Sequence, residues 1–203
     1  MAWAHTTRLP ILIWCLWAFP FTIWDTLYLL LRPHSLPGQK WHDSYFSHVF
    51  AIWASVDHIY GEEGWRNKSG FVLAQSAINV TEATLYMVYI WIILRSGSQI
   101  SASKWRIGGR TGAWAVLVGE VAGCVTATKT AMYFMRECFS GFKYTGHNDW
   151  RPFLVTWGGM NLLYISTSMY MIWTFSNDIL NGLERASMAN SRESQPSKYK
   201  KGG

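Results

Sequence analysis

Four long apolar stretches constrain this chain of 203 residues more than any other feature of its sequence. They run from Pro10 to Leu31, from Gly70 to Leu94, from Gly112 to Met135 and from Phe153 to Phe175. A helix needs about 20 mostly apolar residues to cross the hydrocarbon core of a membrane, and each stretch is long enough. Because lipid satisfies no backbone polar groups, the stretches predict an all-α integral membrane protein, a bundle of four transmembrane helices.

The first stretch contains Asp25 and has no small-residue cleavage site after it, so we interpret it as a retained span rather than a signal peptide. Between the first two spans, residues 45–60 are apolar, but this segment is short and is broken by histidines and an aspartate. That pattern predicts one short interfacial helix rather than a fifth span.

The distribution of basic residues predicts the orientation. With four spans, the N-terminus, the loop from Arg95 to Arg110 and the C-terminal tail share one side, which is the more basic one and therefore faces the cytoplasm. The chain ends in Lys200-Lys201-Gly202-Gly203, which resembles a dilysine signal for retention in the endoplasmic reticulum membrane; the alternative is a plain polar tail. The polar composition of residues 187–203 predicts a disordered cytoplasmic tail, which leaves residues 1–186 as one membrane domain.

Several classes of function lack their usual sequence signals. The three cysteines form no CxxC pair, and no GxGxxG, P-loop, HExxH or GxSxG motif is present, so we expect neither a cofactor nor a metal. The net charge of +6 comes from loops and the tail, where Lys and Arg set topology, so we expect no nucleic-acid partner. The expected partners are a small lipophilic substrate and membrane lipids, and the sequence leaves a homodimer open.

Charged residues inside the predicted spans are the strongest functional signal. A charge at the centre of a span costs about 2.5 to 3.5 kcal/mol, so each one needs a partner, a wet cavity or a function. The spans contain four such residues: Asp25, Glu82, Glu120 and Lys129.

Helical spacing places polar and aromatic residues on one face of each span, because residues three and four apart share a face. If these faces converge, they enclose a pocket within the membrane that is lined by carboxylates, amides and aromatic rings. The faces consist of Trp17, Phe21, Asp25 and Tyr28 in the first span; Gln75, Asn79, Glu82, Tyr86 and Tyr89 in the second; Thr126, Lys129, Tyr133 and Arg136 in the third; and Trp157, Asn161, Tyr164 and Ser168 in the fourth.

Two of the polar residues keep two interpretations each. Asn161 either contacts substrate or ties two helices together. Lys129 is either catalytic or a salt-bridge partner of Asp25 or Glu82. Glu120 points away from the polar face of its span, and we expect it to reach the membrane surface near the cytoplasmic end.

Three segments carry a resemblance to a known family: Ile23-Trp24-Asp25-Thr26-Leu27-Tyr28, Asn79-Val80-Thr81-Glu82-Ala83-Thr84 and Met160-Asn161-Leu162-Leu163-Tyr164. In order and spacing, the chain resembles the EXPERA-domain family over about residues 20 to 180. These are four-span membrane proteins that include the emopamil-binding protein, a sterol Δ8–Δ7 isomerase, and the sigma-2 receptor. It is most similar to small fungal members that share the run from Leu31 to Gly38 and the later run from Val56 to Gly61.

The resemblance implies roles for three residues. In the sterol isomerase, two acidic residues move a proton on and off a ring alkene and an asparagine assists; by position these are Asp25, Glu82 and Asn161. The chain departs from the isomerase pattern at four positions. Asp25 stands where the isomerase has Glu, Phe21 where it has His, Thr130 where it has an acidic residue, and Tyr164 where it has Trp.

The sequence therefore predicts a cofactor-independent membrane isomerase or cyclase that acts on a terpenoid, sterol-like or meroterpenoid substrate by acid–base chemistry. Glu82 would protonate the substrate, Asp25 would remove a proton, and aromatic faces would stabilise the cation between these steps. The alternative is a non-catalytic sterol- or lipid-binding membrane protein. The predicted catalytic residues are Asp25, Glu82 and Asn161, and the predicted substrate-binding residues are Trp24, Tyr28, Gln75, Asn79, Tyr86, Lys129, Tyr133, Trp157 and Tyr164.

Overall fold

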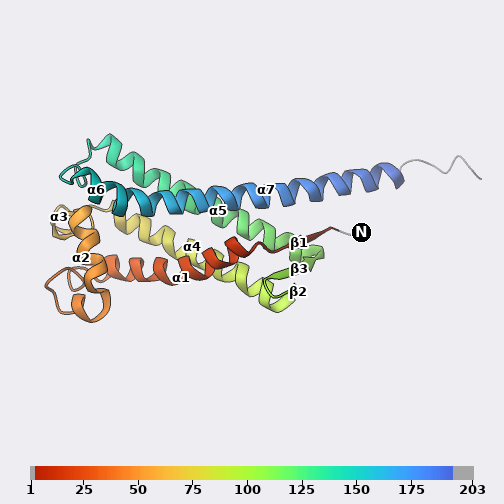
Figure 1. Ribbon diagram of the computed structural model, residues 1–203, viewed down its shortest axis with the longest axis horizontal. Coiled ribbons are helices and arrows are strands. Elements are labelled where there is room, and N and C mark those ends of the chain that lie inside the picture. Colours follow the sequence, from red (N-terminus) through yellow and green to blue (C-terminus); the bar gives the residue numbers. More distant parts are fainter. Residues whose placement is uncertain (1–2, 194–203) are drawn as a thin grey trace, which may run out of the picture.

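The computed structural model describes residues 3–193, and most of them are helical. The long helices of this part of the chain run along a common direction: α1 (Leu9–Leu30), α4 (Phe71–Ser96), α5 (Gly109–Phe139) and α7 (Gly159–Glu193) (Figure 1). In the described residues, α1, α4 and α5 are the three helices long and apolar enough to cross a membrane. These features agree with the predicted all-α class and with a multi-pass membrane protein.

The helices correspond to the predicted spans, with shifted ends. Helix α5 starts three residues before the predicted Gly112 and continues past the predicted Met135 to Phe139. The fourth stretch begins in the short helix α6 (Trp150–Pro152) and a π-helical turn, η2 (Phe153–Gly158), before α7 starts. Helix α7 is the longest and also less apolar, because Ser, Thr and Asn recur along it.

Short helices gather at one end of the bundle, where α2, α3 and α6 lie together (Figure 1). The π-helical turn η1 (His42–Phe46) leads into α2 (Ser47–Val56), which corresponds to the short helix expected between the first two spans. A further helix, α3 (Glu62–Arg66), was not expected. It requires glycine at Gly64, where a Cβ atom would lie 2.1 Å from the Ile59 carbonyl oxygen.

A small antiparallel sheet occupies the other end of the bundle (Figure 1). It consists of β1 (Ala4–Thr6), β2 (Ser98–Ser101) and β3 (Lys104–Gly108) in the order β1-β3-β2, with Ala4 opposite Gly108. The sequence predicted only a loop for residues 95–110, because strands this short have no periodicity of their own. The pairing of β1 with β3 places the N-terminus and this loop at the same end, as predicted.

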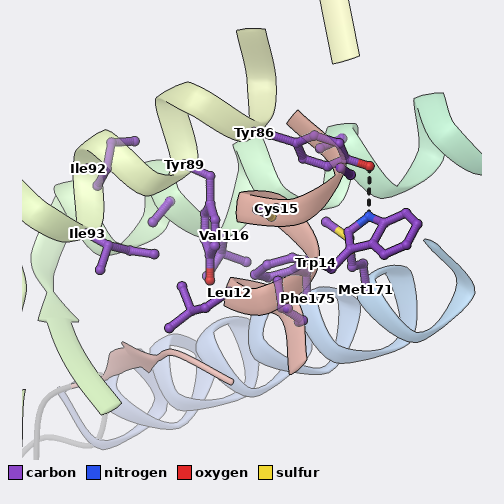
Figure 2. Close-up of a cluster of buried hydrophobic side chains, with 14 of the residues drawn as sticks. Leu12, Trp14, Cys15, Tyr86, Tyr89, Ile92, Ile93, Val116, Met171 and Phe175 are labelled. Atoms are coloured by element: carbon purple, nitrogen blue, oxygen red, sulfur yellow. Dashed lines mark hydrogen bonds between the residues drawn. The ribbon is translucent and has the colours of Figure 1, made fainter. Parts of the chain in front are cut away.

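The apolar core lies between the four long helices towards the sheet end. Helix α4 packs between α1 and α5, and α7 packs along α5, whereas α1 meets α7 mainly through aromatic side chains such as Trp14 and Tyr164. Contact between α5 and α7 is close at Gly119, where a Cβ atom would lie 2.3 Å from the Phe175 ring. Figure 2 shows this core, including Leu12, Trp14, Tyr86, Tyr89, Val116, Met171 and Phe175.

Helix α7 extends further into the tail than the sequence predicted. We expected disorder from Ser187 onward, but the helix continues to Glu193 and projects beyond the sheet (Figure 1). Helix-compatible residues such as Glu184, Arg185 and Ala186 precede this segment, so the helix can propagate through the polar residues that follow. The rest of the predicted tail, with the dilysine-like Lys200-Lys201, lies outside the described residues.

Candidate functional site

The predicted polar faces of the four long helices converge on a cavity of about 170 Å³. The cavity lies between α1, α4, α5 and α7, and α2 covers it with Val49, Phe50 and Trp53. The remaining lining residues are Phe21, Thr22, Trp24, Asp25, Tyr60, Gln75, Asn79, Lys129, Thr130, Tyr133, Met160, Asn161 and Tyr164.

Asp25 is the only carboxylic acid that lines the cavity in the described part of the chain. Its Oδ2 accepts a hydrogen bond of 2.9 Å from Nδ2 of Asn79, on the neighbouring helix α4. The side chain of Tyr60 lines the same cavity. The Asn79 amide therefore orients the side chain of Asp25 while it still faces the cavity.

The sequence left open whether Lys129 pairs with Asp25 or with Glu82, and the structure shows the pair with Glu82. Its ammonium group forms an ion pair with Oε2 of Glu82 and also donates a hydrogen bond of 2.7 Å to Oδ1 of Asn79. The backbone carbonyl of Lys129 accepts a hydrogen bond of 3.2 Å from Gln75. The ammonium lies 5.7 Å from the ring centre of Tyr164, across the cavity on α7.

Glu82 lies behind the cavity wall rather than in it. Its side chain is completely buried, and it is not among the lining residues. Besides the ion pair with Lys129, its Oε1 accepts hydrogen bonds of 2.5 Å from Thr126 and 3.0 Å from Tyr86. The indole of Trp14 in turn donates to the Tyr86 hydroxyl at 3.0 Å, the bond drawn in Figure 2. Both oxygens of this carboxylate are thus occupied by protein donors.

Glu82, Asn79, Lys129 and Asp25 form one polar chain across α4, α5 and α1. The order of contacts is Glu82 to Lys129, Lys129 to Asn79, and Asn79 to Asp25. Only the last three of these residues reach the cavity. The structure therefore separates the two predicted acids, one facing the cavity and one buried behind it.

The other predicted site residues divide into two groups. Trp24, Gln75, Tyr133, Asn161 and Tyr164 line the cavity. The Asn161 amide donates 2.7 Å to the carbonyl of Trp157 in its own helical segment, so this bond does not tie two helices together.

Tyr28, Tyr86 and Trp157 are buried outside the cavity lining. The Tyr28 hydroxyl donates 2.9 Å to the backbone carbonyl of Tyr60, and the Trp157 indole donates 3.3 Å to Asp57. Their positions support the cavity wall through the residues they contact.

Tyr60 is a cavity residue that the sequence analysis missed, because it lies in the connection after α2 and outside any helical stripe. Burial raises the pKa of its hydroxyl well above the ordinary value, and the neighbouring Asp25 and Asp57 act in the same direction. The hydroxyl therefore keeps its proton and can act as a hydrogen-bond donor to Asp25.

Asp57 was also missed, because in the sequence it appears only as a polar interruption of an apolar segment. Its buried carboxylate pairs with Arg136 at 3.2 Å and accepts a hydrogen bond from the Tyr133 hydroxyl. Burial raises the pKa of Asp57, whereas Arg136 and the Tyr133 hydroxyl lower it. Since Tyr133 lines the cavity, Asp57 fixes part of the wall.

Glu120 has a partner that the sequence did not predict. It is partly buried, and its Oε1 accepts a hydrogen bond of 2.9 Å from Ser176 of α7. The close packing of α5 on α7 brings this hydroxyl within range.

In the part of the chain that the structure describes, no group of three His, Cys, Asp or Glu residues is placed to hold a metal ion. Comparisons with family models, with curated proteins and with solved structures give no significant match to this chain. The fold and the cavity define its class: a helical protein with apolar helices of membrane-spanning length around a polar, aromatic-walled cavity.

Proposed function

We propose that the chain is a cofactor-independent membrane isomerase or cyclase that moves protons on a lipophilic terpenoid, sterol-like or meroterpenoid substrate. The main support is the carboxyl group of Asp25, which faces a cavity among apolar helices. A carboxyl group held in a water-poor site next to a substrate can act as general acid or base. The aromatic side chains of the lining suit a lipophilic molecule.

In this proposal Asp25 both removes and returns the proton. Asn79 holds its carboxyl group in position. Glu82 has a different role from the one expected from the sequence. Because both of its oxygens are bound by protein donors, we assign it to balancing the charge of Lys129.

The membrane arrangement is part of the proposal. We infer four spans, with α7 as the fourth, since α7 packs along α5 and completes the cavity wall with Asn161 and Tyr164. We also propose membership of the EXPERA-domain family, on the sequence segments given above. We also propose a location in the endoplasmic reticulum membrane with both termini in the cytoplasm; the distribution of basic residues supports this orientation.

The test compares two acid-to-amide variants. Membranes containing the wild-type chain, Asp25→Asn or Glu120→Gln would be incubated with a panel of terpenoid and sterol substrates, and products would be resolved by chromatography and mass spectrometry. Loss of general acid–base catalysis reduces rates by about 10² to 10⁴-fold, which is expected for Asp25→Asn. Glu120→Gln makes the same chemical change outside the cavity and should retain activity.

Wild-type activity in Asp25→Asn would contradict the assignment of the catalytic carboxyl group. Specific binding of these lipids without turnover by the wild-type chain would favour the alternative function, a non-catalytic sterol- or lipid-binding protein.

A further inference from the structure

Lys129 has more hydrogen-bond donors than it has acceptors in the described part of the chain. A lysine ammonium group carries three N–H donors. Among the described residues it has two acceptors, Oδ1 of Asn79 and Oε2 of Glu82. The side chain is only 10% exposed, yet it lines the cavity. The third donor is therefore available to a molecule bound there.

Lys129 and the carboxyl group of Asp25 are linked through one side chain. One amide group, that of Asn79, binds Lys129 through Oδ1 and Asp25 through Nδ2. These two bonds fix the orientation of the amide and hold the ammonium and the carboxylate on either side of it. Both groups face the same cavity.

We propose that Lys129 binds a carbonyl oxygen of the substrate, and that the substrates are lipophilic ketones that react through an enolate. This inference deepens the proposed function and rests on it for the role of Asp25. In a ketone, the carbon that carries the oxygen is bonded directly to the carbon that carries the acidic hydrogens. An ammonium and a carboxylate separated by one amide group suit that arrangement.

The proposed step conserves atoms and electrons. The Asp25 carboxylate removes a proton from the carbon next to the carbonyl of a β,γ-unsaturated ketone. The C–H electron pair forms a new C=C bond, and the C=O π pair moves to oxygen, where Lys129 donates a hydrogen bond to the enolate. The Asp25 carboxylic acid then returns the proton to the γ-carbon, which gives the conjugated ketone and restores the carboxylate.

A hydrogen bond from Lys129 favours an enolate oxygen at its position in the cavity. A cationic ammonium group stabilises negative charge that develops on a nearby oxygen and opposes positive charge that develops on a nearby carbon. Glu82 makes a buried ammonium tolerable because it supplies an opposite charge from behind the wall. Because Lys129 also lines the cavity, its third donor is available to a substrate there.

The test uses a matched pair of probes with the full chain in lipid nanodiscs. One probe is a bicyclic β,γ-unsaturated ketone, and the other is the same bicyclic alkene with a methylene group in place of the carbonyl. Binding would be followed by quenching of tryptophan fluorescence, and proton transfer by deuterium uptake from heavy water measured by mass spectrometry. Ultraviolet absorbance would report formation of the conjugated ketone.

The decisive variant is the double substitution Lys129→Met with Glu82→Gln, which removes the donor without leaving a buried charge unpaired. Glu82→Gln alone is measured beside it: this variant removes the counterion but keeps the Lys129 amino group, so it separates the effect of losing the carboxylate from the effect of losing the donor. The wild-type chain should bind the ketone more tightly than the alkene and exchange only the ketone. A hydrogen bond to a charged group contributes about 1.5–3 kcal/mol. The ratio of ketone affinity to alkene affinity should therefore fall at least about tenfold in the double variant.

The outcomes separate this inference from the proposed function. Equal binding of both probes by the wild-type chain, or an unchanged ketone preference in the double variant, would overturn carbonyl recognition by Lys129. A ketone preference that depends on Lys129, without deuterium uptake, would support carbonyl recognition while the proposed acid–base function fails. Deuterium uptake into the alkene that is unaffected by the double variant would overturn the inference and leave the proposed function standing.

Discussion

The ion pair between Lys129 and Glu82 leads to a quantitative prediction about stability. Replacing Lys129 by Met removes the only cation that contacts Glu82 among the described residues, and the Glu82 side chain is completely buried. Removing one partner of a buried ion pair typically costs about 3–5 kcal/mol. Glu82 would keep its hydrogen bonds from Thr126 and Tyr86, so we expect a loss near the lower limit, about 3 kcal/mol.

The double variant Lys129→Met with Glu82→Gln should recover much of that loss. The Gln amide oxygen can still accept the bonds from Thr126 and Tyr86, and no unpaired charge remains. We therefore expect a coupling energy of about 2 kcal/mol between the two positions, within the range found for residues in contact. A double-mutant cycle measured by unfolding in mixed detergent micelles, with tryptophan fluorescence as the signal, gives this quantity.

The reasoning would be refuted by either of two results. Lys129→Met alone could lose less than about 1 kcal/mol, which would mean that Glu82 needs no cation. Alternatively, the double variant could be as unstable as Lys129→Met, which would mean that packing of the lysine chain, and not its charge, stabilises the site.

Two further predictions concern the ends of the bundle and the helix packing. His5→Ala removes hydrogen bonds of 2.7 Å to Asp178 and 3.1 Å to Tyr89. The variant should be less stable to unfolding by about 2 kcal/mol. Its N-terminal strand should also be cleaved more readily in limited proteolysis. Unchanged protease resistance would contradict this. Gly119→Val places a Cβ atom 2.3 Å from the Phe175 ring, so α5 and α7 must separate, at a cost of about 1–3 kcal/mol measured by the same unfolding assay. Wild-type stability would show that the Phe175 ring moves freely.

Local patterns explain why much of the fold was predictable. Apolar length identified the four long helices, and spacing of three and four identified the faces that line the cavity, because both depend only on residues within one helix. Asp25, Asn79 and Lys129 were found in this way. The ends of the helices and the small sheet were not, since the β1 strand pairs with β3 from a distant part of the sequence.

By itself, then, the sequence determined which residues could not face lipid and which helix faces had to turn inward. Only the tertiary structure decided what those residues do. It placed Asp25 on the cavity and Glu82 behind it, although both are acids on inward faces. The physical reason is that helical periodicity fixes the direction in which each side chain points from its own helix axis. How far a side chain lies from the cavity, and which residue it pairs with, depend on how the neighbouring helices pack. Lys129 lies on α5, and its ion pair with Glu82 distinguishes this buried acid from Asp25, which faces the cavity.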